Sequence, residues 1–127
     1  MALYDEVGGA TAVRAALDAF YPRALADATL SPFFLGVDVE RLKRIQEGFF
    51  AMALGGPNAY TGRSLHDAHV RTRQRGVNDD VFDHFLTVFK WVLVDLGVPD
   101  GKVGEWLEVF EGARDQILRR RADAKEI

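Results

Sequence analysis

The sequence predicts an all-α fold from three observations. Apolar residues recur at intervals of three and four in several segments, which is the period of one face of a helix. No stretch alternates strictly between apolar and polar residues, as a half-buried strand would. The 127 residues, 48% of them hydrophobic, suit one globular core. We therefore expect a single domain over residues 1–121 and a frayed tail at residues 122–127.

The first long helix is predicted over residues 10–26, after a Gly-Gly pair that breaks the chain. Its apolar positions repeat with helical spacing and include Tyr21. Pro22 lies deep in this segment, where a proline removes the hydrogen bond to the carbonyl of Asp18 and costs about 3 kcal/mol in a regular helix. We therefore expect a kink or a local break just after Tyr21.

Capping residues locate the next two elements. Ser31, followed by a proline at the first helical position, predicts the start of a short turn that carries Phe33 and Phe34. Asp38 predicts the N-cap of a helix over residues 39–54, and the Gly-Gly-Pro sequence that follows would end it. The inward face of this helix is apolar except for one glutamine.

The C-terminal half contains the most regular helical pattern. A short helix over residues 65–70 is expected first, followed by a basic loop over residues 71–76. Asn78 predicts the N-cap of a helix over residues 79–96, whose apolar residues keep a helical period throughout. The last helix is expected over residues 101–120, although two glycines weaken it by about 1 kcal/mol each relative to alanine.

Composition and motifs exclude several functional classes. The absence of cysteine excludes disulfides, a thiolate nucleophile, iron-sulfur clusters and cysteine-ligated zinc. Sixteen Lys and Arg against nineteen Asp and Glu give a net charge of -3, so we expect no nucleic-acid partner. No Ser-His-Asp arrangement or phosphate-binding glycine loop supports a hydrolase or a kinase. No signal peptide or membrane span is recognisable, so we expect no membrane insertion and a cytoplasmic location.

Three histidines are the candidate metal ligands. His66 and His69 are three residues apart and share a helix face, so a two-histidine metal site is one alternative, with Asp67 pointing elsewhere. Considered singly, a histidine on a short helix is more often a solvated or core side chain than a ligand. His84 lies on the polar edge of its helix and is interpreted as a surface residue.

Tyr21 and Gln46 are polar residues on apolar helix faces. A buried hydroxyl or amide without a partner costs about 1 to 3 kcal/mol, so both side chains need hydrogen-bond partners. Two interpretations are open. The two residues bond to each other or to nearby backbone, or they direct donors into a cavity that holds a ligand.

A series of residues with a distinctive order and spacing covers nearly the whole chain. The series comprises Tyr4-Asp5, Gly8-Gly9, Phe20-Tyr21, Leu25-Ala26-Asp27, Phe33-Phe34, Gln46, Phe49-Phe50, Leu54-Gly55-Gly56-Pro57, Tyr60-Thr61-Gly62, His69 and Gly97-Val98-Pro99. In this series the chain resembles the truncated haemoglobins of group I, which are short relatives of the globins. The resemblance implies a two-over-two helical sandwich with a short first helix and a short proximal helix.

The resemblance also implies a haem b cofactor, with His69 as the proximal iron ligand and His66 outside the ligand set. By globin analogy, the Nδ1 hydrogen of His69 would be donated to a backbone carbonyl such as that of Leu65. Tyr21 and Gln46 match the family's pair of distal hydrogen-bond donors.

Further positions match the walls of the family's haem pocket. Phe34 corresponds to the phenylalanine that wedges against the haem, and Leu42 occupies the place where larger globins carry a distal histidine. Phe50 is expected to line an apolar tunnel to the haem, and Phe85 is assigned to the haem pocket. The remaining expected contacts are with the haem propionates, from Arg71, Arg73 and Arg41.

The sixth coordination position is expected to be open or occupied by water. Ile45 and Lys43 flank the place where some relatives offer a ligand from the protein, and Ile45 cannot bind iron. In the ferric state Lys43 or Tyr21 itself are the alternatives.

Tight O2 binding with slow release is the expected consequence of two distal donors, and CO should gain less from them. The favoured function is oxidation of nitric oxide to nitrate, and the alternative is O2 storage, transport or gas sensing. For this function we expect an unidentified electron donor as a partner. The protein itself is expected to be a monomer or a weak dimer. A third interpretation is a helical module whose pocket is vacant or filled by lipid.

Overall fold

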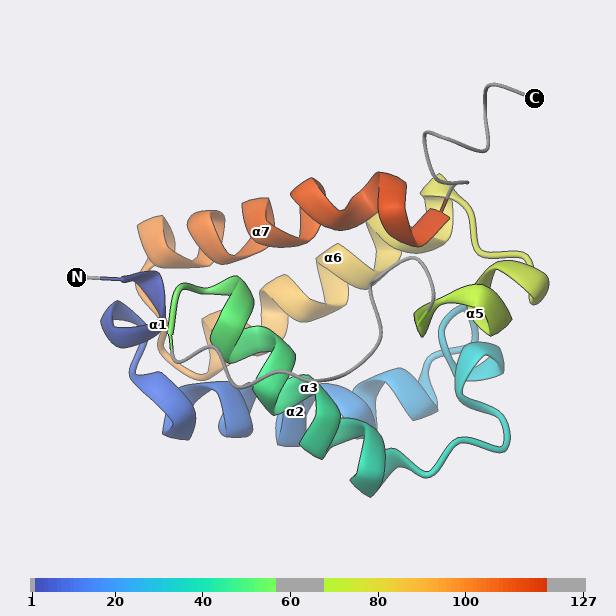
Figure 1. The fold of residues 1–127 in the computed structure, drawn as a ribbon, viewed down its shortest axis with the longest axis horizontal. Helices are drawn as coiled ribbons and strands as arrows, with labels where there is room; N and C mark the ends of the chain where they lie inside the picture. Colours follow the sequence, from blue (N-terminus) through green and yellow to red (C-terminus); the bar gives the residue numbers. More distant parts are fainter. Residues whose placement is uncertain (1, 57–67, 119–127) are drawn as a thin grey trace.

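The computed structural model describes residues 2–56 and 68–118, and every regular element in these ranges is helical (Figure 1). The elements are α1 (Leu3–Glu6), α2 (Gly9–Ala26), the 3-10 helix η1 (Ser31–Phe34), α3 (Val39–Ala53), α5 (Val70–Gln74), α6 (Asp79–Asp95) and α7 (Asp100–Leu118). The all-α prediction is therefore confirmed. Of the described helices, none has the length and apolar character needed to cross a bilayer.

Two pairs of helices form the fold. α2 packs against α3, α6 packs against α7, and α2 also packs against α6, which joins the two pairs. In Figure 1, α6 and α7 lie on one side of the molecule and α2 and α3 on the other, with α5 at one end. This is the two-over-two sandwich that the resemblance implies, and its first and fifth helices are short.

Aromatic side chains fill the core between the two pairs. Phe89 on α6 lies at its centre, with ring centroids 4.9 Å from Phe110 and 5.8 Å from Trp106, both on α7. Phe50 of α3 and Phe20 of α2 complete the cluster, at 6.1 Å and 5.3 Å from Phe89. Most of these pairs are tilted or edge-to-face, which is the favoured geometry of aromatic rings, so the core is rigid as well as apolar.

The predicted helix boundaries are mostly confirmed. α2, α3 and α6 each begin and end within one residue of the predicted ranges. The side chain of Asp38 accepts a hydrogen bond from the backbone of Arg41 at 3.2 Å, and that of Asn78 accepts one from Val81 at 2.9 Å. α7 begins at Asp100, while residues 119 and 120 of the predicted helix lie outside the described residues.

The prediction that Ser31 caps the short turn is wrong. The N-cap residue of η1 is Leu30, and among the described residues no side-chain hydrogen bond caps this helix. Asp27 instead caps the turn that precedes η1, since its Oδ1 accepts hydrogen bonds from the backbone of Thr29 at 2.9 Å and of Leu30 at 3.0 Å. The other carboxylate oxygen of Asp27 lies 2.6 Å from Nε2 of His84 on α6. Asp27 directly follows α2, so its carboxylate lies beside the first backbone amides of the turn that have no helical partner. Ser31 comes after these amides in the chain. His84 is correspondingly bonded to a carboxylate, and not simply a surface residue.

The expected break after Tyr21 does not occur. α2 continues as a helix through Pro22 to Ala26. Pro22 is exposed while Tyr21 and Ala24 are buried, so the carbonyl that loses its helical partner lies on the solvent side and water can hydrate it. Packing of the buried face then maintains the helix past the proline.

The basic loop predicted over residues 71–76 is also corrected, because Val70–Gln74 forms the helix α5. No residue of α5 is buried, so its sequence carries no apolar period that could have predicted a helix. Residues 65–67 of the predicted short helix and the tail at 122–127 lie outside the described residues.

Replacing Asp27 with alanine is expected to lower the free energy of unfolding by about 1 to 2 kcal/mol, because the variant loses the two hydrogen bonds from the turn that precedes η1. The hydrogen bond with His84, followed by the backbone bonds, lowers the pKa of Asp27 below its ordinary value. Its contribution is therefore present above the ordinary pKa and is lost as the pH falls through the folded-state pKa. The difference between wild type and variant should shrink below about pH 4 in urea unfolding experiments.

The matched control for this prediction is Asp38→Ala, which removes a cap that has no histidine partner. Asp38→Ala should lower the free energy of unfolding by less than Asp27→Ala does at neutral pH. Equal costs for the two variants, or a pH-independent cost for Asp27→Ala, would contradict the prediction.

Candidate functional site

A cavity of about 1030 Å³ is lined by residues from both helix pairs, from η1 and from α5. This volume is at the upper end of the range of roughly 300 to 1,000 Å³ typical of ligand pockets. Most of the side chains around it are apolar. The expected site residues that lie at its wall are Tyr21, Phe34, Leu42, Gln46, Phe50, His69, Arg71 and Phe85. Residues far apart in the sequence therefore come together around one space.

A hydrogen bond between two helices supplies the polar part of this wall. The hydroxyl of Tyr21, on α2, donates to Oε1 of Gln46, on α3. Tyr21 is only 2% exposed, and its ring lies edge-on to those of Phe20 and Phe34, with centroids 5.2 Å and 5.5 Å away. Both interpretations of these two residues are therefore compatible with the structure, because the pair bonds to itself and also faces the cavity.

Burial keeps the phenol of Tyr21 neutral. Desolvation raises the pKa of Tyr21 far above its ordinary value, and the bond to Gln46 offsets only part of this rise. The hydroxyl therefore retains its hydrogen at any pH at which the protein is folded and active. The wall of the cavity thus has a phenol and an amide but no charge at this point.

His69 reaches the cavity from another element. It is the N-cap residue of α5 and is partly buried. Leu65, whose carbonyl was expected to accept the Nδ1 hydrogen, and His66, the other member of the two-histidine alternative, lie outside the described residues. Among the residues that are described, no cluster of three or more His, Asp or Glu could hold a metal ion on its own.

Aromatic residues connect the cavity wall to the core. Phe34 belongs to η1 and contacts the ring of Tyr21. Phe85 lies 5.4 Å from Phe20 and 5.2 Å from Phe110, between centroids. Phe50 is 7% exposed and packs against Phe110 with a centroid separation of 5.4 Å. The rigid core therefore forms one side of the cavity.

The arginines of α5 divide between two places. Arg71 lies at the cavity wall, as does Arg41 of α3. Arg73 is not part of this wall, and its Nη1 instead donates to the backbone carbonyls of Ile117 at 3.0 Å and Gln116 at 3.3 Å. Positions 71 and 73 are separated by about 200° around a helix, so they face opposite sides. The predicted loop gave no reason to expect that Arg71 and Arg73 would point in different directions.

The structure also separates the two flanking side chains of α3. Ile45 lies at the cavity wall. Lys43 does not, since its Nζ lies 3.1 Å from Asp18 and 3.0 Å from Glu40, measured to carboxylate oxygens. Lys43 is therefore engaged on the surface, away from the position that a sixth ligand would need.

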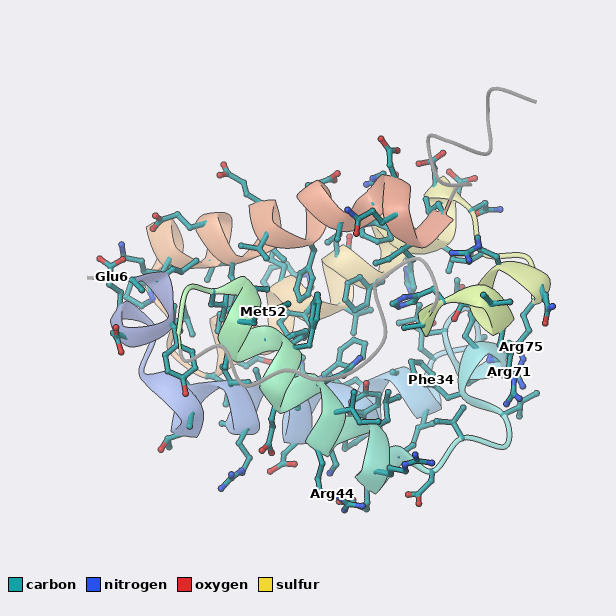
Figure 2. The ribbon with its side chains drawn as sticks, in the orientation of Figure 1. Glu6, Phe34, Arg44, Met52, Arg71 and Arg75 are labelled. Carbon is teal, nitrogen blue, oxygen red and sulfur yellow. The ribbon has the colours of Figure 1, made fainter. Side chains whose placement is uncertain are left out.

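Sequence reasoning missed Arg75, which follows α5. Its Nη1 donates to the carbonyl of Pro32 at 3.1 Å and its Nη2 to that of Leu35 at 2.9 Å. Figure 2 places Arg71 and Arg75 together at the end of the molecule formed by α5 and the η1 segment. The acceptors are backbone groups about 40 residues earlier in the chain, so no side-chain pattern in the sequence could have identified them.

The wall fits a large, mainly apolar, planar group that carries a metal and acidic substituents. One imidazole, that of His69, would suit a bond to a metal that the group itself already holds. The two exposed guanidiniums of Arg41 and Arg71 suit carboxylates that reach from the cavity to solvent. The neutral Tyr21–Gln46 pair suits a small polar ligand of that metal.

Comparison with known proteins finds a matching family model and similar chains. The family model described as bacterial-like globin matches residues 2–119. A group 1 truncated hemoglobin, GlbN, of Mycolicibacterium paratuberculosis is 40% identical over 120 residues, covering 94% of this chain and 86% of that protein. A group 1 truncated hemoglobin of Tetrahymena pyriformis is 33% identical over 116 residues, covering 91% of this chain and 93% of the relative.

A solved structure is similar over the whole domain. The 2/2 hemoglobin of a Synechococcus species, determined in the cyanomet state with covalently attached heme, has a TM-score of 0.88 at 31% sequence identity. The alignment covers 94% of this chain and all of that one. The match therefore extends to the arrangement of the helices.

A double-mutant cycle is expected to reveal the coupling between Tyr21 and Gln46. Gln46→Leu should destabilise the protein by about 1 to 3 kcal/mol, because it leaves a buried hydroxyl without its acceptor. In the Tyr21→Phe background the same change should cost much less, which gives a coupling energy of about 0.5 to 3 kcal/mol in urea unfolding.

The control cycle combines Tyr21→Phe with Glu47→Gln, since Glu47 neighbours Gln46 but pairs with Arg14. That pair should be additive within about 0.5 kcal/mol. Additivity in both cycles would mean that the Tyr21–Gln46 hydrogen bond contributes nothing.

Proposed function

Since the chain belongs to the bacterial-like globin family and its group 1 truncated hemoglobins, we propose that it is a haem b protein that binds O2 reversibly and oxidises nitric oxide to nitrate. The family implies a haem cofactor and a gaseous ligand. The finer assignment is supported by one observation above the others. A buried, neutral pair of hydrogen-bonding side chains faces the same cavity as a histidine from a separate helix.

In this proposal His69 holds the cofactor through an imidazole nitrogen. Phe34, Leu42, Phe50 and Phe85 provide the apolar contacts for the macrocycle. When bound, haem iron supplies a position at which O2 or CO binds reversibly.

The arginines at the cavity wall are the residues proposed to pair with the haem propionates. Arg71 and Arg41 are both exposed there, so their guanidiniums can pair with carboxylates at the edge of the cavity. Arg73, although expected in this role from the sequence, is engaged with carbonyls of α7.

Tyr21 and Gln46 supply hydrogen-bond donors to the gas. While Oε1 of Gln46 accepts from Tyr21, the Gln46 amide nitrogen keeps two hydrogens for other acceptors. If the side-chain amide of Gln46 flips, its nitrogen donates to the phenol oxygen of Tyr21. The hydroxyl hydrogen of Tyr21 then becomes available to another acceptor. Either arrangement presents a donor without moving a helix.

These donors favour retention of O2. A hydrogen bond to a group that carries charge is worth about 1.5 to 3 kcal/mol, and about 1.4 kcal/mol corresponds to a factor of ten in affinity. Bound CO is less polar than bound O2, so the same hydrogen bonds increase its affinity less. Because the pKa of Tyr21 is raised, this stabilisation does not titrate near neutral pH.

Slow O2 release suits reaction with nitric oxide better than delivery of O2. The overall reaction joins nitric oxide, O2 and one electron to give nitrate, and an external electron donor restores the ferrous state. Tyr21 and Gln46 hold the O2 until nitric oxide reaches it. The rival function, O2 storage, transport or sensing, would use the same residues without this turnover.

The cofactor assignment is tested by the visible spectrum of the purified protein, reduced and then exposed to air. We expect a haem Soret band and a persistent oxygenated spectrum, both weakened or lost in His69→Ala. His84→Ala is the matched control, because His84 pairs with Asp27 and is not part of the cavity wall. A protein that stays colourless after addition of haemin would overturn the proposal.

The reaction assignment is tested by rapid mixing of the oxygenated protein with nitric oxide. Formation of ferric haem and stoichiometric nitrate, at a rate limited by mixing, is the expected result. Slow or incomplete formation of nitrate would favour the non-enzymatic rival instead.

A further inference from the structure

Helix α5 carries His69 at its N-cap but has little of its own to fix its position. It has five residues, and none of them is buried. Helices far shorter than about 12 residues are not stable by themselves, and burial of an apolar face normally holds them in a protein. Some other interaction must therefore position this segment.

Arg75 ties α5 to the η1 segment. Its two terminal nitrogens donate to two different carbonyls, those of Pro32 at 3.1 Å and Leu35 at 2.9 Å. The segment between them contains Phe34, which contacts the ring of Tyr21. The guanidinium therefore links the segment that carries His69 to the part of the wall that carries the Tyr21–Gln46 pair.

Arg73 ties α5 to α7. Its Nη1 donates to the carbonyls of Ile117 at 3.0 Å and Gln116 at 3.3 Å, in the last described turn of α7. In Figure 1, α5 lies between the η1 segment and this end of α7. The two arginines thus hold α5 from two sides, each through bonds from a charged donor, which are stronger than neutral ones.

We propose that Arg73 and Arg75 form a clamp of positioning residues that sets the place of His69 relative to the Tyr21–Gln46 pair. The proposal rests on the haem function proposed above. Neither guanidinium touches the cofactor in this role, and both act through the position of α5. The clamp depends on the forked shape of arginine, because a lysine ammonium cannot copy the planar geometry with which Arg75 reaches two carbonyls.

The shape requirement separates the clamp from a purely electrostatic role. If Arg75 attracted the acidic groups of the cofactor, Arg75→Lys would preserve most of its effect, since the charge remains. If Arg75 is part of the clamp, Arg75→Lys should resemble Arg75→Ala. Arg44→Ala is the control, because Arg44 is an exposed arginine of α3 with no hydrogen bond or ion pair to the described residues.

The first measurement is haem loss to excess apomyoglobin, together with the iron–histidine stretching band in the resonance Raman spectrum of the ferrous protein. Arg75→Ala, Arg75→Lys and Arg73→Ala should each release haem about tenfold faster, which corresponds to about 1.4 kcal/mol. Each should also shift or broaden the Raman band, which a uniform loss of stability would not do. Arg44→Ala should match wild type in both.

The second measurement is amide hydrogen exchange over residues 70–75 in the protein as purified, with the helix content checked by circular dichroism. Exchange in this segment should be about tenfold faster in the same three variants and unchanged in α3. If Arg75→Ala fails to fold, Arg75→Lys carries the same test, because it keeps the charge and most of the alkyl chain.

Two results would overturn the clamp. One is haem loss and a Raman band at wild-type values in Arg75→Lys, and the other is unchanged exchange over residues 70–75 in Arg75→Ala. Failure of the wild-type protein to bind haem would overturn the proposed function alone, since the exchange experiment would still decide whether the arginines hold α5.

Discussion

The hydrogen bond from Tyr21 to Gln46 joins α2 and α3 at a polar point in a mainly apolar wall. Because Tyr21 is almost completely buried, its hydroxyl must keep a partner, and only a fixed register of the two helices provides one. The same constraint determines the chemistry of the cavity. The pair remains neutral and able to donate to a small ligand, so one interaction both fixes the contact of α2 with α3 at this point and prepares the site.

The two sides of the cavity are stabilised by different forces. Long helices and a cluster of phenylalanine and tryptophan rings build the side formed by α2, α3, α6 and α7, and burial of apolar surface holds it together. The segment with His69 has no buried residue and depends on hydrogen bonds from Arg73 and Arg75. Polar contacts therefore position the histidine segment, whereas apolar packing positions the core.

The η1 segment connects the apolar core to the segment that carries His69. Asp27 accepts a hydrogen bond from Leu30, directly before this segment, and pairs with His84 of α6, while Arg75 binds the carbonyls of Pro32 and Leu35. Phe34 lies within this segment, so its contact with Tyr21 depends on polar groups at both ends. A hydrogen-bonding contact from α6 and hydrogen bonds from the α5 side thus stabilise the segment that carries this aromatic side chain of the cavity wall.

The sequence by itself determined the four long helices, the caps at Asp38 and Asn78, and the unusual status of Tyr21 and Gln46, because these depend on local period and local capping. It predicted the family for a similar reason, since many fixed spacings recur in order along the chain. Only the tertiary structure decided that Asp27 pairs with His84 and that α2 continues past Pro22. It also decided that Arg71 and Arg73 face different ways, since their partners are groups distant in sequence or solvent, and no local pattern encodes those.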